Sequence, residues 1–590
     1  MKINNGYSYK KNGWLYISVK GTPKERGVAY GYYCANEFKE IQKMLRYYIF
    51  ESYGSPWSYF IKKINDDFKT ITKTLYLELY EEMEGIAEGC VAGGCETTLD
   101  EIIAWNFYCS IPYWYSFVSN NHIGKEGGGG GQSNTNKYSE QTFLSIHQKK
   151  HANDKCSAFM AVGDWTKDGK ILVAHNSFCD YIDGQYSNVV LDIIPDKGFR
   201  MIMQTSPCWI WSGTDFFITS AGIIGTETTI GGFQPYEKRI PIGYRIRTAM
   251  QYAATIDGYI SLLVNGNSGD YANSWLFGDT KTNEIARLEL GLKYHSVSRT
   301  NNGYLIGFNA PYDPRIRNFE VSNSGFYDIR RHQGARRVRL EQLMKKYKGK
   351  LNLELAKQIL ADHYDVYLKK DNNPCSRTVC SHYDLDARKY MSQIGRPTPY
   401  APHGAVDGMV CDTTLANKMS FIGRFGNSCG IPFIKDKYCK EHIQFSNICH
   451  FLKDRPTQPW TPFQARNFNK KNYNNYLKNK NSIKETIAFK GEGPSEFKLE
   501  DASNYYTYDN NNNMKIKYYT DENINYIPNS VIIKNKQIIT GKTSSSNNSN
   551  KNSNKNSNKK YSSKSVNIIK KENTKKNKVT KNKTKKYKKY

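Results

Sequence analysis

The sequence predicts an α+β protein in which layered sheets are flanked by helices. Residues 23–119 repeat apolar side chains at three- and four-residue spacing, which is typical of helices that pack by one face. After residue 156, apolar or alternating runs are separated by Asp-Gly, Ala-Gly and Thr-Lys-Thr-Asn turns, the pattern of β-hairpins. Helical spacing returns in "GARRVRLEQLMKKY" and "NLELAKQILADHY". Helices and strands in separate blocks are typical of the α+β class.

Residues 1–119 are expected to form an α-rich N-terminal region. The segments "AYGYYCANEFKEIQKMLRYYIFESY" and "LYLELYEEMEGIAEGCVAGG" have helical periodicity. In "TTLDEIIAWNF" a Thr-Thr pair precedes an acidic first turn, which predicts the start of another helix.

Residues 120–155 predict a flexible linker. The stretch "NNHIGKEGGGGGQSNTNKYSEQ" contains five consecutive glycines and many Ser and Asn residues, which bury little apolar area and fix no single backbone conformation. Such a segment is expected to be exposed and cleavable. A phosphate-binding loop is disfavoured, because no Lys-Ser/Thr pair follows the glycines and no strand precedes them.

The C-terminal part of the chain changes composition twice. Residues 466–540 are rich in Asn, Lys and Tyr, and residues 541–590 hold 17 lysines and one acid. That tail supplies +16 of the net charge of +29, so most of the basicity belongs to an appendage rather than to a binding face. We expect the tail to be disordered. It is read mainly as a solvated low-complexity extension, with weak contact to a polyanion or a membrane surface as the functional alternative.

The cysteines predict neither a disulfide framework nor a metal site. The first residues, "MKINNGYSYKKNGW", contain no apolar signal segment, and no run reaches the roughly 18 apolar residues that span a bilayer. We therefore expect mostly reduced thiols and a cytoplasmic or particle-associated protein rather than a lysosomal or secreted one. Cys375 and Cys380 lie near His363 and His382 in the sequence, but no second close Cys pair follows. Ordinary core or loop thiols are favoured over structural zinc, and no cofactor is expected.

Cys156 marks the border between the linker and the first apolar strand. If residues 166–169 ("TKDG") form a three-residue hairpin connection, Cys156 lies opposite Asp180, and Asn176 and Asp180 share its face of the sheet. If the turn is a two-residue Asp-Gly connection, the register slips by one and His175 joins that face instead. Either register places polar groups beside a buried thiol, which favours a site, although a small apolar thiol at a strand start is the plain structural alternative.

Several ordered segments together resemble the phospholipase B-like proteins and their bacterial relatives. These segments are "GTPKERGVAYG", "EMEGIAEG", "CSAFMAVGDWTKDGKILVAHNSF", "GTDFFITSAGIIGTETTIGGF", "YANSWLFGDTKTNEIARLELGLK", "NAPYDPRIRNFE", "GARRVRLEQL" and "PHGAVDGMV". The resemblance covers roughly residues 13–465 and places the chain among the N-terminal-nucleophile (Ntn) hydrolases. It implies a four-layer αββα sandwich over residues 156–465, with the N-terminal region as a retained propiece.

The resemblance also implies an activity. Family precursors cut themselves before a cysteine, so the Lys155–Cys156 bond is expected to break and to leave Cys156 with a free α-amine. An α-amine titrates near pH 8, so it accepts the proton of the neighbouring thiol without a separate histidine. The thiolate then attacks an amide or ester acyl carbonyl, of a lipid or another acyl compound, and forms a thioester.

The same resemblance suggests roles for five further residues. Asn273 is expected to donate to the oxyanion, and a backbone N–H near Thr228 is a weaker candidate. Asp180 is expected to hold the α-amine, and His175 to orient the thiol or the substrate. Arg337 is expected to bind an acidic part of the pocket or substrate, with a helix-surface salt bridge as the alternative. For Asn273 the alternative is an ordinary turn residue.

Three functional alternatives stay open. An acyltransferase would resolve the thioester with an amine instead of water. A conventional cysteine protease would use His295 or His403 as its base and would need no self-cleavage. A non-catalytic basic binding protein would keep the fold for structural use. Aromatic stretches such as "CWIWSG", "DFFIT" and "NSWLF" suit an apolar acyl group but are more typical of a core.

Overall fold

The structure is a computed structural model that describes residues 3–123, 156–322, 324–387 and 399–466. It also describes the backbone of two short paired strands, β17 (Tyr506–Tyr508) and β18 (Met514–Ile516). The predicted linker from residue 124 onward, most of the predicted 466–540 extension and the whole 541–590 tail lie outside the described residues. The chain divides into a unit of residues 1–534 and a second unit of residues 535–590, and only the first contains described residues.

The larger of the two main sheets has nine strands in the order β1-β2-β5-β6-β7-β8-β9-β10-β11. They are β1 (Gly6–Lys11), β2 (Trp14–Gly21), β5 (Val189–Pro195), β6 (Met201–Thr205), β7 (Phe216–Thr219), β8 (Ile223–Thr229), β9 (Asn273–Asp279), β10 (Glu284–Leu290) and β11 (His295–Thr300). Neighbouring strands are antiparallel except β2 and β5, which pair in parallel from Leu15 with Val189 to Gly21 with Pro195. A strand from the N-terminal region therefore lies inside the sheet.

The second sheet has seven strands, with the order β12-β3-β4-β14-β15-β16 and β13 paired to the end of β4. They are β3 (Cys156–Gly163), β4 (Gly169–Asp180), β12 (Gly303–Gly307), β13 (His403–Ala405), β14 (Asp407–Asp412), β15 (Ser420–Phe425) and β16 (Thr461–Gln464). The hairpins predicted from the sequence are present as β3–β4, β7–β8 and β9–β10. Strands β1 and β2 precede residue 23, where the predicted helices begin. The sequence predicted no strand in this part of the chain.

The two sheets face each other across one apolar cluster. Because side chains alternate along a strand, Ala158, Met160 and Val162 of β3 point into this cluster, together with Leu276 of β9. Phe159 and the other alternate residues of β3 point the opposite way, toward a second cluster that includes residues of two helices. The sheets are thus packed face to face, and β3 lies between the edge strand β12 and β4.

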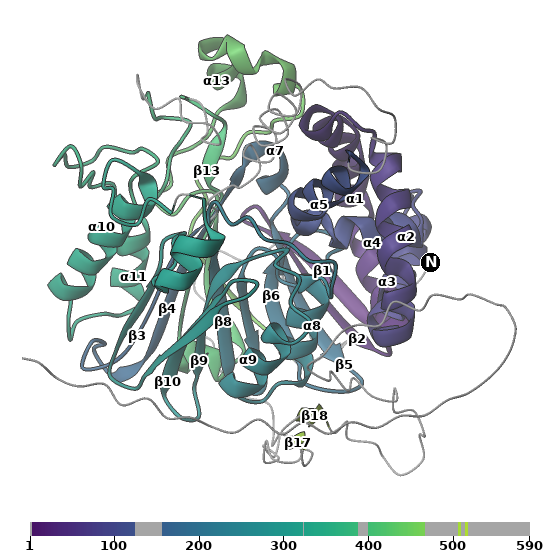
Figure 1. Cartoon of the computed structure of the whole chain (residues 1–590), viewed down its shortest axis with the longest axis horizontal. Coiled ribbons are helices and arrows are strands. Elements are labelled where there is room, and N and C mark those ends of the chain that lie inside the picture. Colours follow the sequence, from purple (N-terminus) through teal and green to yellow (C-terminus); the bar gives the residue numbers. More distant parts are fainter. Residues whose placement is uncertain are drawn as a thin grey trace, which may run out of the picture. The chain divides into compact units, whose positions relative to one another are not determined.

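Helices cover the outer faces of both sheets (Figure 1). Beside the nine-stranded sheet lie α1 (Pro23–Tyr53), α2 (Trp57–Leu75), α3 (Leu77–Ala92), α4 (Leu99–Asn106), the 3-10 turn η1 (Tyr108–Ser110), α5 (Ile111–Ile123), α8 (Ile242–Tyr252) and α9 (Ile256–Val264). Beside the seven-stranded sheet lie α10 (His332–Lys346) and α11 (Leu353–Leu360). The short elements are α7 (Tyr181–Gly184), η2 (Ile316–Glu320), α12 (Thr413–Ala416), α13 (Lys435–Glu441) and η3 (Ile443–Ile448). The predicted α+β class is confirmed.

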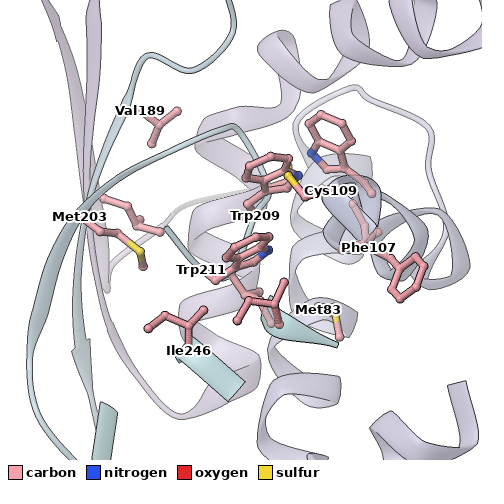
Figure 2. Packing of buried hydrophobic residues seen from close by; sticks show 14 of the residues in the cluster. Met83, Phe107, Cys109, Val189, Met203, Trp209, Trp211 and Ile246 are labelled. Carbon is pink, nitrogen blue, oxygen red and sulfur yellow. The ribbon is translucent and has the colours of Figure 1, made fainter. Parts of the chain in front are cut away.

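The core under the N-terminal helices is rich in aromatic residues. Figure 2 shows Trp209 and Trp211 between the sheet and the helices, near Phe107 and Met83. The two indole rings are stacked with their centroids 5.5 Å apart. The aromatic segment "CWIWSG" is therefore part of the core, as its composition indicated.

Helices α1 and α3 pack in close backbone contact through glycines. A Cβ added at Gly31 would lie 2.1 Å from the carbonyl oxygen of Ile86, and one added at Gly89 would lie 2.1 Å from that of Val28. No larger residue fits at either position. These glycines belong to the segments "GTPKERGVAYG" and "EMEGIAEG". Both segments therefore have a packing function in this chain.

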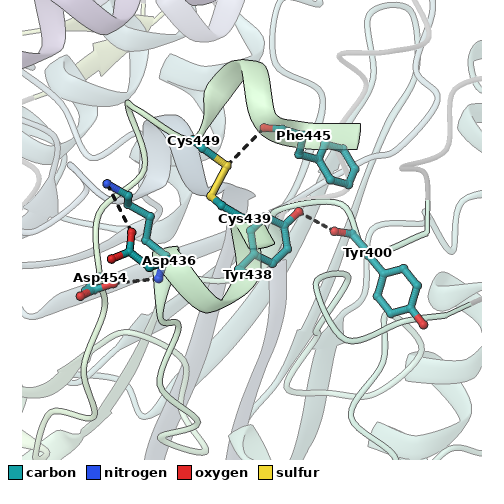
Figure 3. The surroundings of a disulfide bond; sticks show 8 residues. Tyr400, Asp436, Tyr438, Cys439, Phe445, Cys449 and Asp454 are labelled. Carbon is teal, nitrogen blue, oxygen red and sulfur yellow. Dashed lines mark hydrogen bonds and ion pairs between the residues drawn. A yellow bond between two sulfur atoms is a disulfide. The ribbon is translucent and has the colours of Figure 1, made fainter. Parts of the chain in front are cut away.

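Most cysteines form no disulfide, as predicted. One disulfide joins Cys439 of α13 to Cys449, which follows η3, and the other eleven cysteines are not disulfide-bonded (Figure 3). The hydroxyl of Tyr438 donates a 2.6 Å hydrogen bond to the carbonyl oxygen of Tyr400, which ties the same surface segment to a distant loop. Among the helices that the structure describes, none combines the length and apolarity needed to cross a bilayer.

Candidate active site

Cys156 is the first residue of β3 and is completely buried. Its partner on β4 is Ser177, so the predicted pairing with Asp180 is wrong. The connection takes up residues 164–168 and the register shifts between Ala161 and Gly163, which displaces β4 relative to a three-residue turn. With this register His175 and Ser177 share the face of Cys156. Of the two predicted registers, only the one with a two-residue Asp-Gly turn placed His175 on that face.

A carboxylate lies next to the thiol. Cys156 Sγ is 3.7 Å from Oδ2 of Asp215. The backbone φ of Asp215 is 73°, which is unusual for a residue other than glycine. The hydroxyl of Tyr271, which has one hydrogen to share between them, lies 3.2 Å from the same Oδ2 and 2.9 Å from Oε1 of Glu227. Burial, followed by the nearby Glu227 and Asp215 charges, raises the pKa of the Cys156 thiol well above its ordinary value. The thiol is therefore protonated at neutral pH and needs a base before it can attack.

His175 completes a group of three reactive side chains. A ring nitrogen of His175, the Cys156 sulfur and an Asp215 carboxylate oxygen all lie within 4.8 Å of one another. Burial lowers the pKa of His175 to about 3, and a contact with the Glu227 backbone acts in the opposite direction. With so low a pKa the imidazole stays neutral and is only a weak base; it can orient the thiol, and the three donor types could also hold a metal ion.

Two residues that the sequence did not single out hold the backbone of Cys156. The Cys156 backbone N–H donates to Oδ1 of Asn309 at 3.2 Å, and the guanidinium of Arg336 donates to the Cys156 carbonyl oxygen. Arg336 also donates to Asn309 Oδ1 at 2.6 Å and to the Ser157 hydroxyl at 3.1 Å. Both residues lie in segments that carry the resemblance, "NAPYDPRIRNFE" and "GARRVRLEQL". Their position in these segments was the sequence signal that could have identified them as site residues.

Arg337 points away from this backbone. It pairs with Glu341 one turn along α10 at 3.1 Å and donates to the Phe326 carbonyl oxygen at 3.2 Å. The helix-surface salt bridge, which was the alternative interpretation, describes its contacts. Its neighbour Arg336, and not Arg337, contacts the backbone of Cys156.

Asn273 and Thr228 lie at the ends of two paired strands. Asn273 begins β9 opposite Thr229, and Thr228 pairs with Ser274. Both atoms of the Asn273 amide group and the Thr228 hydroxyl are buried without a hydrogen-bond partner among the described residues. Since such atoms normally have partners, these groups are available to a ligand. Thr228 packs against Gly307 of β12, the strand next to β3.

Asp180 lies on a small cavity rather than opposite the thiol. Its carboxylate accepts from the Tyr48 hydroxyl at 2.6 Å and lies 2.8 Å from Nδ1 of His403. The cavity, of about 50 Å³, is lined by residues of α1, η1, α5, β4 and β8 and by Tyr271. Tyr271 separates it from Asp215. Of the two histidines considered as conventional bases, His403 contacts Asp180 and His295 is exposed on β11.

Asp407 is a further buried acid at the same end of the sheets. It accepts from the backbone N–H of Ser177 at 2.9 Å and from the Gln204 amide at 2.5 Å. Burial raises its pKa to about 7, with a contribution from the charge of Asp215, while its hydrogen bonds act in the opposite direction. It belongs to the segment "PHGAVDGMV", in which the sequence singled out His403 but not Asp407.

Comparison with known proteins gives two partial similarities. No protein-family profile matches the chain. An uncharacterized protein of Archaeoglobus fulgidus is 22% identical over 280 residues, which cover 46% of this chain and 42% of that protein. A Bos taurus protein named "Putative phospholipase B-like 2" is 27% identical over 163 residues, which cover 24% of this chain and 27% of that protein. The chain thus spans less than half the length of these relatives.

Proposed function

We propose that this protein is an autoprocessed cysteine hydrolase of amide or ester acyl bonds, with Cys156 as its N-terminal nucleophile. The observation that carries the proposal is the position of Cys156 at the start of a buried strand, with Asn309 on its backbone nitrogen and Asp215 and His175 beside its sulfur. Two facing sheets with helices on both outer faces fit the αββα architecture expected of Ntn hydrolases. The similarity to a phospholipase B-like protein agrees with a hydrolase and makes lipid acyl bonds a natural substrate class.

Self-cleavage would begin with attack of the Cys156 thiol on the carbonyl carbon of Lys155. The thiol proton passes to the Cys156 nitrogen as the C–N bond breaks, which leaves a thioester and a free α-amine. Water then hydrolyses the thioester, so that Lys155 ends as a carboxylate and the thiol is restored. Asn309 accepts from the nitrogen that becomes the amine and therefore holds it in place throughout.

Substrate hydrolysis would use the same sulfur. The α-amine takes the thiol proton, the sulfur attacks the acyl carbonyl, and the proton moves to the departing alcohol or amine. Water resolves the thioester and releases the acid. Because the raised pKa of the thiol keeps it protonated, a base within reach is essential, and the α-amine supplies it. Asn273 is our candidate donor to the oxyanion, since its amide has no partner among the described residues.

The N-terminal fragment is expected to stay bound after the cut. Strand β2 lies between β1 and β5, and residues of β2, α1, α3 and α4 share one apolar cluster with β5, β6 and α8. Separation would expose this cluster and break the β2–β5 ladder. The cavity beside Asp180 is lined from both fragments, so a substrate that enters there would contact residues from each.

Electrophoresis under denaturing conditions tests the proposal. At about 115 Da per residue, wild-type protein should yield fragments of about 18 and 50 kDa, and the larger should begin at Cys156 on N-terminal sequencing. Cys156→Ala should stay whole, while Cys375→Ala, which removes another buried thiol, should be cut like the wild type. An electrophilic acyl probe should label Cys156 in the mature protein. An uncut wild type whose Cys156 resists the probe would refute the proposal.

A second candidate is an unprocessed cysteine hydrolase. The closeness of Cys156, His175 and Asp215 favours it, since these are the side chains of a nucleophile, a base and an orienting acid. It predicts a full-length chain whose Cys156 is labelled by the same probe. The two candidates are therefore separated by the N-terminal sequence of the labelled species.

A further inference from the structure

We propose that His363, Cys380, His382 and Cys429 bind one structural zinc ion. Their four ligand atoms all lie within 4.8 Å of one another. The cluster is distinct from the Cys156 site, because it shares no residue with it and lies against the loops that follow α11 and β15. Two cysteines and two histidines are the most familiar ligand set for structural zinc.

The interatomic distances match a tetrahedral site. Nε2 of His382 is 3.4 Å from the sulfur of Cys380 and 3.4 Å from that of Cys429. With Zn–S of about 2.3 Å and Zn–N of about 2.0–2.1 Å, a tetrahedron places sulfur and nitrogen ligands about 3.6 Å apart. The imidazole rings of His363 and His382 are 5.1 Å apart and inclined at 71°, so both can direct a nitrogen to a shared centre.

Surrounding groups orient the ligands as they do in known zinc sites. While Nε2 of His382 faces the sulfurs, its Nδ1 lies 3.6 Å from the Asp384 carboxylate, on the side where zinc-bound histidines commonly have a carboxylate. The backbone N–H of Ile431 approaches the Cys429 sulfur at 3.5 Å, and such contacts stabilise a thiolate. Two thiolates and two neutral imidazoles also balance the charge of Zn²⁺, which a buried site requires.

The cluster joins segments that lack regular secondary structure. Between the end of α11 at Leu360 and the start of β13 at His403, the described residues form no helix and no strand. Three ligands come from this stretch and the fourth from the loop after β15. An ion would link the two loops to each other, as structural zinc does in small loop-rich domains.

Metal analysis of the full-length protein tests the proposal. Protein purified from zinc-supplemented cells and dialysed should contain one zinc per chain. The double variant Cys380→Ser and Cys429→Ser should contain none, whereas Cys375→Ala, which removes a nearby buried cysteine outside the cluster, should keep it. Cys156→Ala should also keep its zinc, so failure of the proposed hydrolase activity and failure of this proposal are separate results.

Cobalt provides a readout that does not depend on how well the variants fold. Wild-type protein stripped with a chelator should lose thermal stability and then take up one Co²⁺, with sulfur-to-cobalt charge transfer and the strong visible bands of tetrahedral coordination. Zinc-free wild type that takes up no Co²⁺, a disulfide between Cys380 and Cys429 found by mass spectrometry, or zinc retained by the double variant would each overturn the proposal.

Discussion

The side-chain oxygen of Asn309 lies 3.2 Å from the backbone nitrogen of Cys156, at the bond on which the proposed self-cleavage acts. The same Asn309 donates to the carbonyl oxygen of Thr229 at 2.7 Å and accepts from Arg336. One side chain therefore links β3, the end of β8 and α10. This gives Asn309 a positioning role that can be separated experimentally from the chemistry of the thiol.

Replacement of Asn309 should impair self-cleavage. Asn309→Ala removes the acceptor that fixes the Cys156 nitrogen, and misplacement by about 1 Å is enough to slow a reaction about 100-fold. The time course of fragment formation after refolding measures the effect. Asn302→Ala, at an exposed turn, serves as the control. Fragment formation at the wild-type rate in Asn309→Ala would contradict the assignment.

Replacement of Asn273 should affect turnover without affecting stability. Its amide group makes no hydrogen bond among the described residues, so Asn273→Ala leaves no broken pair behind. If the amide donates to the oxyanion, kcat/KM for a chromogenic acyl ester should fall about 10²- to 10³-fold. Urea unfolding of the same variant should remain close to that of the wild type. Equal kcat/KM values for the two proteins would remove Asn273 from the mechanism.

Adjacent arginines on α10 should differ in their importance. Arg336→Lys loses several charge-assisted hydrogen bonds in a buried position and should reduce the free energy of unfolding by about 2–3 kcal/mol. Arg337→Lys affects a partly exposed pair with Glu341 and a hydrogen bond to the Phe326 carbonyl oxygen, and should cost less than about 1 kcal/mol. Chemical denaturation of both variants makes the comparison. A larger loss of unfolding free energy in Arg337→Lys than in Arg336→Lys would contradict the assignment of Arg336 as the arginine that supports Cys156.

Acid should destabilise the folded protein through His175. Burial lowers its pKa from 6.5 to about 3, so between these values the unfolded chain binds a proton that the folded chain does not. The stability due to the neutral imidazole is therefore complete above pH 6.5 and is lost as the pH falls toward 3. His175→Gln should flatten this part of the profile of unfolding free energy against pH. His295→Gln, at an exposed position, should leave the profile unchanged, and an equally steep loss in both variants would exclude His175 as the cause.

Local patterns in the sequence predicted much of the fold. The turn residues between β3 and β4, β7 and β8, and β9 and β10 marked three hairpins, and Thr98 caps α4 by accepting from the Glu101 N–H at 3.1 Å. Strand β2 was missed although Asn12-Gly13, a typical hairpin turn, joins it to β1; only its other partner, β5, lies more than 160 residues away. The register of β3 and β4 was also wrong, since an irregular turn and a shift near Gly163 leave no clear signal in the residues themselves.

The candidate site was predictable only in part, because some of its residues lie far apart in the sequence. Cys156 and His175 belong to one hairpin, so local counting could place them near each other. Asn309 and Asp215 reach the cysteine from separate loops, and only the tertiary structure brings them there. The sequence disfavoured zinc at Cys375 and Cys380, because no second close Cys pair follows them. In the structure Cys380 lies near Cys429, and no spacing rule connects these two cysteines.

The parallel ladder between β2 and β5 has a consequence for any attempt to prepare the two halves separately. Without residues 14–21, the hydrogen-bonding edge of β5 would be bare, and a bare edge recruits strands from other molecules. We therefore expect a recombinant chain that starts at Cys156 to precipitate when made alone. Coexpression with residues 1–155 should return it to solution.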